Sequence, residues 1–217
     1  MGNASMPDSH VELAKATIRA FVSRGEAPEP PPGLPEELAR RRAGVFVSVK
    51  KRGELRGCIG TIGPTCANVA EEIVQNAVSA CSRDPRFPPV AEDELDGLTV
   101  SVDVLGVPEP VGSLGELDPA RYGVIVSKGY RRGLLLPNLD GVDTVERQLA
   151  IALDKAGLRG VGGYAVEKFE VVRHERGGDM GGAAGGGGNG RSVGIGDGGA
   201  DRSVGSGAGG DGGGGDA

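Results

Sequence analysis

Two hydrophobic patterns follow one another along this chain, the period-two pattern of strands and the wider spacing of helices. Their order constrains the fold more than any other feature of the sequence. Val45, Val47 and Val49 alternate with more polar neighbours, which is the period-two pattern of a strand. The stretch "GVFVSVKKRGELRGCIGTIG" continues through a Gly-containing turn into a second run of strand-like residues. The stretch "YGVIVSKGYRRGLLLPNLD", at residues 122–140, repeats this arrangement around "KGYRRG". We therefore expect two hairpins, at residues 44–63 and 122–140.

Helical spacing of apolar residues fills the intervals between these hairpins. It predicts helices in "SHVELAKATIRAFVSRG", in "PTCANVAEEIVQNAVSACSRDPRF" and in "DTVERQLAIALDKAGL", with N-caps at Ser9, Thr65 and Asp143. Single alternating strands are expected in "DGLTVSVDVLG" and "GYAVEKFEVVRHE". Hairpins interleaved with helices predict an α+β fold, with a mostly antiparallel sheet and helices packed on it.

The last 41 residues differ from the rest of the chain. Residues 177–217 contain 21 glycines and no aromatic residue, so they cannot bury enough apolar surface to offset the entropy of ordering. We expect a disordered start at residues 1–7, one domain at residues 8–176 and a Gly-rich disordered tail at residues 177–217. A domain of about 170 residues is long enough to bury a core.

Charge and composition exclude several classes of protein. The net charge is −6, from 24 basic and 30 acidic residues, so no overall positive field favours nucleic acid, which is an unlikely partner. No apolar run approaches the roughly 20 residues that span a bilayer, and the start "MGNASMPDSH" lacks the pattern of a signal peptide. Three cysteines without an export signal predict free thiols in the cytoplasm.

The stretch "LRGCIG", at residues 55–60, carries the main candidate for chemistry. A catalytic Cys58 needs a thiolate, and strand alternation places Arg56 on the same face as Cys58, where its charge would favour that form. Arg86 in "DPRF" is a second possible source of positive charge. A base is harder to find, because both histidines lie near the ends of the predicted domain. Glu54 is the alternative base.

Two other interpretations of Cys58 remain open beside catalysis. It is a small buried residue in a tight hairpin, or it belongs to a recognition groove together with Arg56. In a groove, Gly57 and Gly60 would let a ligand or another backbone come close. Arg86 would clamp a carboxylate or phosphate, and Asn138 would line the groove. No metal site and no cofactor are expected, because the cysteines lack metal-binding spacing and no phosphate-binding glycine motif is present.

The chain resembles the AMMECR1 domain family, also known as protein A of the AmmeMemoRadiSam system. The residues that carry the resemblance are "LRGCIG", "DPRFPPV" and "GLLLP", in the order and at the spacing that the family shows, and they lie within residues 8–172. The chain departs from the family pattern at Val145, where a tryptophan is usual, and at Asn138, where a glutamine is usual. It contains no tryptophan.

This resemblance implies an α+β fold with a larger lobe, a small subdomain and a groove between them beside the "LRGCIG" hairpin. It implies no settled chemistry. A binding or adaptor module for a peptide or a small anionic ligand is favoured, because no base is visible for Cys58 and aromatic stacking residues are scarce. The resemblance implies Memo-type and radical SAM proteins as its partners. The alternative is an enzyme of a modification pathway that uses Cys58 as its nucleophile.

Overall fold

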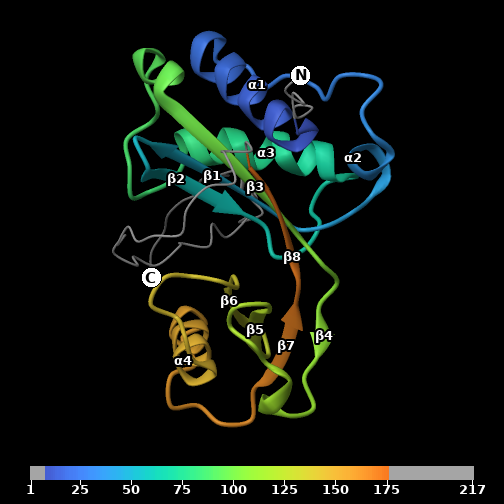
Figure 1. Cartoon of the computed structure of the whole chain (residues 1–217), viewed down its shortest axis with the longest axis vertical. Helices are drawn as coiled ribbons and strands as arrows, with labels where there is room; N and C mark the ends of the chain where they lie inside the picture. The colour runs from blue at the N-terminus through green and yellow to red at the C-terminus, as the bar shows by residue number, and fades with distance from the viewer. Residues whose placement is uncertain (1–7, 176–217) are drawn as a thin grey trace, which may run out of the picture.

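The computed structural model describes residues 8–175, and the predicted disordered start and Gly-rich tail lie outside them. The described residues form two lobes, one above the other in Figure 1. The larger lobe contains α1 (Ser9–Arg24), α2 (Glu36–Arg40), β1 (Val45–Lys51), β2 (Glu54–Gly60), α3 (Val69–Ser82), the 3-10 helix η1 (Glu92–Gly97), β3 (Leu98–Leu105) and β8 (Val171–Glu175). The smaller lobe contains β4 (Glu109–Pro110), η2 (Leu114–Glu116), β5 (Gly123–Lys128), β6 (Arg131–Leu135), α4 (Val145–Lys155) and β7 (Ala165–Phe169).

Each lobe is built on one four-stranded sheet. The strand order is β2-β1-β3-β8 in the larger sheet and β4-β7-β5-β6 in the smaller one. All neighbouring strands in both sheets are antiparallel. The predicted α+β class is therefore confirmed, and so are both predicted hairpins, which are β1–β2 and β5–β6.

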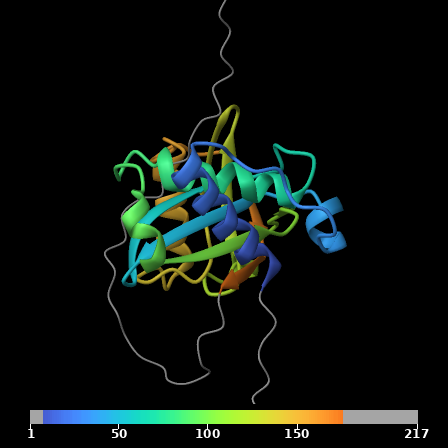
Figure 2. The same cartoon turned by 90° about the horizontal axis from the view of Figure 1, so that it is seen from above.

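The larger sheet is covered by helices on one face only. Figure 2 shows α1 and α3 lying across its strands. The alternating valines of β1 and β3, among them Val47 and Val102, point to these helices and are fully buried. Period-two alternation gives the strands one apolar face, and this face packs against the apolar stripes of the helices. The contact between them forms the main core.

The helices begin close to the predicted positions, but different residues cap them. Asp8, and not Ser9, caps α1, and its carboxylate accepts from the backbone N–H of His10 and Val11. Asn68 caps α3 three residues after the predicted Thr65, and Thr144 caps α4 one residue after Asp143. Several residues in each of these segments have side chains able to cap a helix, so composition alone does not select between them.

A third apolar cluster, separate from the core of each lobe, joins the two lobes, and we call it the seam. It contains Phe46, Cys58, Leu105, Ile125, Leu134 and Phe169, which come from both sheets. The uncovered face of the larger sheet thus packs against the smaller lobe. The chain runs between the lobes from β7 into β8, which are separated by Glu170 alone and follow one another in Figure 1.

Candidate functional site

Cys58 lies on β2 and faces the seam. Its neighbour Ile59 packs against the core beneath the helices, so Cys58 points to the opposite face of the sheet. The residue is 5% exposed. Ser48 lies directly opposite on β1, and its hydroxyl donates a hydrogen bond of 3.2 Å to the Cys58 Sγ. The thiol therefore belongs to a packed interface between the lobes.

The backbone of Cys58 is held by the "DPRF" segment. β2 is an edge strand, and Asp84 Oδ2 accepts from the Cys58 N–H at 2.8 Å. Arg86 Nη2 donates to the Cys58 carbonyl oxygen at 3.2 Å, and Arg86 also binds Asp84 through two nitrogens at 2.9 and 2.6 Å. This ion pair satisfies both backbone groups of Cys58, as a neighbouring strand would. We call Asp84 and Arg86 the clamp.

The clamp is electrostatically stable. Burial alone would raise the pKa of the Asp84 carboxyl, but hydrogen bonds from Arg86 and from the Cys58 N–H outweigh burial and lower it. Asp84 is 4% exposed, so an ionised carboxylate at this depth depends on its partners. The charged pair therefore fixes the position of Cys58 at neutral pH.

The Cys58 thiol itself is not activated. Burial raises its pKa, and the opposing effects of the Ser48 hydrogen bond and the Arg86 charge do not offset burial. Asp103 and Asp84 add to the increase. The thiol is thus protonated at neutral pH.

Neither histidine reaches this thiol. His174 lies opposite Val102 in the sheet register and so faces the helix-covered side, while Cys58 faces the seam. His10 stacks on His174. The predicted difficulty in finding a base therefore has a structural reason, because the sheet separates the imidazoles from the thiol.

Lys155 is a cation of the seam that the sequence does not reveal. It is the last residue of α4, and its Nζ donates to the carbonyl oxygen of Leu134 at 3.3 Å. Burial lowers its pKa, the Arg86 charge lowers it further, and Cys58 opposes the decrease. Within residues 8–175, no carboxylate forms an ion pair with Lys155. The positive charges of Arg86 and Arg173, in contrast, are matched by Asp84 and Asp103.

Asp103 and Arg173 extend the polar part of the seam. Asp103 on β3 is 2% exposed and faces away from the helices. Arg173 on β8 binds both of its carboxylate oxygens, at 2.7 and 3.0 Å. The strand alternation of "TVSVDVL" places Asp103 opposite the valine face, but only the sheet register pairs it with Arg173.

Arg56 does not join Cys58 in the way that simple alternation predicts. The β1–β2 register shifts between Val49 and Lys50, so Arg56 lies at an irregularity of the ladder. Its guanidinium donates to the carbonyl oxygens of Pro88 and Pro89 and to both oxygens of Glu94. Its described hydrogen bonds go to this segment, and none goes to Cys58.

The chain itself occupies the space beside both glycines of "LRGCIG". A Cβ on Gly57 would overlap the carbonyl oxygen of Ala80 in α3, and one on Gly60 would overlap the ring of Phe46. Asn138 is exposed, has a left-handed backbone with φ of 52°, and donates its N–H to the carbonyl oxygen of Pro119. A ligand-binding role for Gly57, Gly60 or Asn138 remains a prediction.

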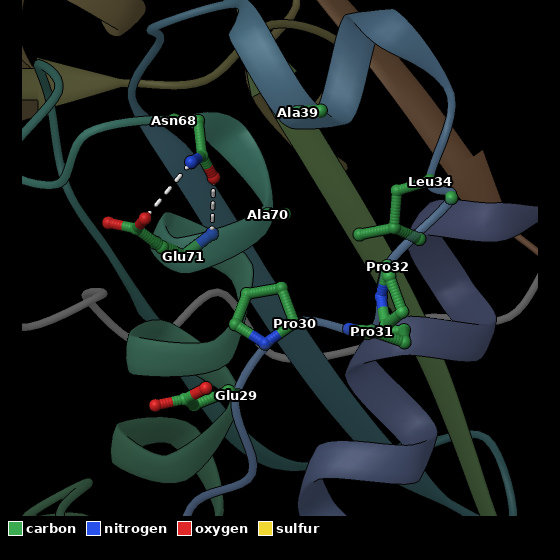
Figure 3. A pocket seen from close by; sticks show the side chains of 10 residues that line it. Glu29, Pro30, Pro31, Pro32, Leu34, Ala39, Asn68, Ala70 and Glu71 are labelled. Atoms are coloured by element: carbon green, nitrogen blue, oxygen red, sulfur yellow. Dashed lines mark hydrogen bonds between the residues drawn. The ribbon is translucent and has the colours of Figure 1, made fainter.

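A hollow of about 500 Å³ lies elsewhere, lined in part by the proline-rich segment of residues 29–34. Figure 3 shows Pro30, Pro31 and Pro32 among the residues that line it, together with Asn68, Ala70 and Glu71 from the start of α3. The polar groups of Asn68 and Glu71 bind each other there, since Glu71 N donates to Asn68 Oδ1 at 2.9 Å and Asn68 Nδ2 donates to Glu71 Oε1 at 3.0 Å. These polar groups are used in capping α3 and are not directed at a ligand. The seam is therefore the stronger candidate for a functional site.

Comparison with known proteins agrees with this fold. The AMMECR1 family model matches residues 11–176, which is most of the chain. This protein therefore belongs to the AMMECR1 family. Within residues 8–175, no helix has the length and apolar character needed to cross a membrane.

Its relatives come from bacteria and archaea. A protein of Thermotoga maritima is 57% identical over 150 residues, covering 69% of this chain and 86% of that protein. A protein of Clostridium acetobutylicum is 52% identical over 169 residues, but this chain spans only 36% of its length. The crystal structure of an uncharacterized protein, PH0010 from Pyrococcus horikoshii, matches with a TM-score of 0.70 and 34% identity, covering 76% of this chain and 88% of the other.

Proposed function

We propose that this domain is a binding module and that its seam takes an anionic group, a carboxylate or a phosphate, beside Cys58. The observation that carries the proposal is the charge balance of the seam. Asp84 and Asp103 neutralise Arg86 and Arg173, whereas Lys155 has a backbone carbonyl and no carboxylate among the described residues. A partly buried ammonium group gains most from a counterion brought by a ligand.

The state of Cys58 supports binding over catalysis. A buried thiol whose pKa is raised is a weak nucleophile at neutral pH, and no histidine lies on its side of the sheet. Cys58 would then be a neutral contact at the floor of the site. The clamp would hold its backbone in position, and Ser48 would orient its thiol.

The anionic group would be part of a peptide or of a small molecule. The resemblance to a family that accompanies Memo-type and radical SAM proteins supports a segment of such a partner as its source. Three free cysteines support a reducing compartment such as the cytoplasm for this interaction. One cation and one thiol suit an acidic side chain or a phosphate better than an extended polyanion.

Binding of simple anions tests the proposal directly. Inorganic phosphate and succinate are titrated separately into the full chain labelled with ¹⁵N, and backbone and lysine side-chain spectra are recorded. We expect saturable shifts at Cys58 and Lys155 that Lys155→Gln abolishes. The control is Lys168→Gln, because Lys168 already pairs with Glu116 at 3.1 Å. Shifts that are unchanged in Lys155→Gln, or absent from the wild type at millimolar anion, would overturn the proposal.

One observation favours the alternative, an enzyme that uses Cys58 as nucleophile. Both backbone groups of Cys58 are fixed by a charged pair, which is the kind of preorganisation that catalytic residues require. Substitution separates the two functions. A binding module retains anion-dependent shifts in Cys58→Ser, whereas an enzyme of this kind loses all turnover of its substrate.

A further inference from the structure

Both histidines of the chain meet on the helix-covered side of the larger sheet, away from the seam. His10 lies in the first turn of α1 and His174 on β8, and their rings stack at 3.6 Å between centroids, with 18° between their planes. One carboxylate serves both rings. Asp8 Oδ1 lies 3.2 Å from His10 Nδ1, and Asp8 Oδ2 lies 2.7 Å from His174 Nδ1. We call Asp8, His10 and His174 the clasp.

The geometry of the clasp suits protons better than a metal ion. The three residues offer ligand atoms within 4.8 Å of one another. However, the lone pairs of imidazole nitrogens lie in the ring planes, and two nearly parallel rings direct them side by side. A single ion at the usual distance of about 2.0 Å would lie far out of both ring planes. The stacked rings therefore do not converge on a metal position.

The hydrogen bonds define which nitrogen of each ring carries the proton in the neutral stacked pair. Because the ionised carboxylate of Asp8 only accepts, each ring donates its Nδ1–H to it. In a neutral ring that carries its proton on Nδ1, Nε2 is unprotonated. Both Nε2 atoms are buried and have no hydrogen-bond partner within the part of the chain that the structure describes. The neutral pair is thus self-consistent, with all its donors used.

We propose that the clasp is a pH-sensitive device that holds β8 and the start of α1 together near neutral pH and releases them on acidification. A proton added to either ring sits on an Nε2 that has no acceptor. A second proton places two cations 3.6 Å apart. The contact joins residues 166 positions apart, so the clasp ties together the two ends of the described chain.

The charges around the clasp leave this balance intact. On α2, Glu37 favours a cationic His10, but Arg41 pairs with Glu37 at 2.9 Å. β3 contributes the apolar Val102 opposite His174. The strand neighbours of His174, which are Arg173 and Glu175, point to the other face of the sheet. Among residues 8–175, Asp8 is thus the one carboxylate that touches both rings.

The direction of the pKa shift of His10 agrees with release on acidification. Burial lowers its pKa, His174 adds to the decrease, and Asp8 and Glu37 oppose it. A lowered pKa in the folded state contributes stability above the unfolded value of about 6.5, and this stability is lost as pH falls from there towards the folded value. Burial alone would raise the pKa of Asp8, but the hydrogen bonds from His174 and His10 lower it, so Asp8 stays ionised throughout this window.

Release of β8 would also reach the seam, and this step rests on the proposed function. His174 and Arg173 are consecutive on β8 and face opposite sides of the sheet. If β8 leaves β3, Arg173 leaves Asp103, which is 2% exposed in the seam. Acidification would then leave the Asp103 carboxylate without its counterion and weaken binding of an anion beside Cys58.

Histidine NMR and amide exchange on the full chain test the clasp without any ligand. The chain has two histidines, so every imidazole signal belongs to one of them. We expect the His10 titration midpoint to lie below the ordinary histidine value of about 6.5. We also expect protection factors of the Val171–Glu175 amides, corrected for intrinsic exchange, to fall about tenfold between pH 7 and pH 5.

The matched control is the double variant His10→Asn/His174→Asn, which keeps a donor near each Nδ1 position but cannot titrate in this range. Its β8 protection should be independent of pH within about threefold. The wild-type measurements decide the matter even if this variant does not fold. Two midpoints near 6.5 together with unchanged β8 protection would overturn the clasp. A clasp that opens without any change in phosphate affinity at the seam would overturn only its link to the proposed function.

Discussion

Each lobe contains a hairpin followed by a helix, and the two units pack in the same way but differ in one cross-strand pair. In the larger lobe, Gly57 on the second strand lets the backbone of α3 approach, and in the smaller lobe Gly133 does the same for α4. The residue after each glycine points into the seam, and these residues are Cys58 and Leu134. In both lobes, a glycine on the second strand thus allows the helix backbone to pack closely on the hairpin.

The cross-strand partners show what differs. Ser48 lies opposite Cys58, whereas Ile125 lies opposite Leu134. The Leu134 carbonyl oxygen accepts from Lys155, as the Cys58 carbonyl oxygen accepts from Arg86. The Ile125–Leu134 pair shows that two apolar residues are enough for packing at this cross-strand position. The Ser48–Cys58 pair adds a hydroxyl and a thiol on the larger lobe's side of the seam, where the smaller lobe has only apolar side chains.

The largest loss of stability should come from replacing the two glycines that let a helix pack closely on each hairpin. Gly57→Ala and Gly133→Ala each place a Cβ against a backbone carbonyl oxygen of the facing helix, that of Ala80 or Ala152. We expect each to cost about 3 kcal/mol or more, or to prevent folding. Urea unfolding measures this cost. Gly97→Ala is the control, because nothing lies within 4 Å of its added Cβ, and it should change stability by less than about 0.5 kcal/mol. Mild effects at Gly57 and Gly133 would refute the common packing.

Truncation of Leu134 and of Cys58 should show which of the two seam residues contributes mainly to packing. Leu134→Ala should cost about 2–4 kcal/mol, because it leaves a cavity in the seam. Cys58→Ala removes one sulfur atom and should cost about 1 kcal/mol. The difference is measured by denaturant unfolding of both variants under one condition. Equal costs would mean that Cys58 carries as much packing as its counterpart in the smaller lobe.

Loss of the clamp should have a comparable but pH-dependent effect. Asp84→Asn deprives Arg86 of its carboxylate and should cost about 2–3 kcal/mol at pH 7. Because the pKa of Asp84 is lowered by folding, the wild-type advantage is present above about 3.8 and is lost as pH falls below that value. Unfolding curves at pH 7 and at about pH 2.5 measure this convergence. The control is Glu36→Gln, which breaks an exposed pair with Arg40 and should cost less than about 0.5 kcal/mol.

Substitution of Lys155 should have the smallest effect on stability and the largest effect on anion binding. Lys155 has a lowered pKa in the folded protein, so its charge is destabilising at neutral pH and this penalty fades as pH rises towards 10.5. Lys155→Met should therefore leave stability unchanged or raise it by up to about 1 kcal/mol at pH 7. Thermal unfolding measures this, while phosphate titration should show no binding. A clear loss of stability would make Lys155 a structural residue of the seam.

The sequence predicted the elements of the fold well because period-two and helical patterns are local. The valine face of β3 and the glycine of each hairpin turn can be read from neighbouring residues. The caps at Asp8 and Asn68 were placed one to three residues away, because adjacent side chains compete for that role. Residues 163–175 were expected as a single strand, but Glu170 divides it between two sheets.

The site was predicted only in part, because its contacts join distant segments. Cys58 and Arg86 were both selected, and the structure brings them together through Asp84 across 26 and 28 positions. Lys155 at the end of a helix and Arg173 on the last strand look like ordinary surface charges in the sequence. Arg56 was assigned by strict alternation, which the register shift in the ladder breaks.

The pKa of the Cys58 thiol tests the central claim, that this residue is a neutral contact and not a nucleophile. Iodoacetamide labelling is followed against pH in the full chain with Cys66→Ala and Cys81→Ala, so that Cys58 is the only thiol. We predict slow labelling that increases only above about pH 9, since burial disfavours the thiolate. Fast labelling with a midpoint well below the free-thiol value of about 8.5 would contradict the claim and favour an enzyme.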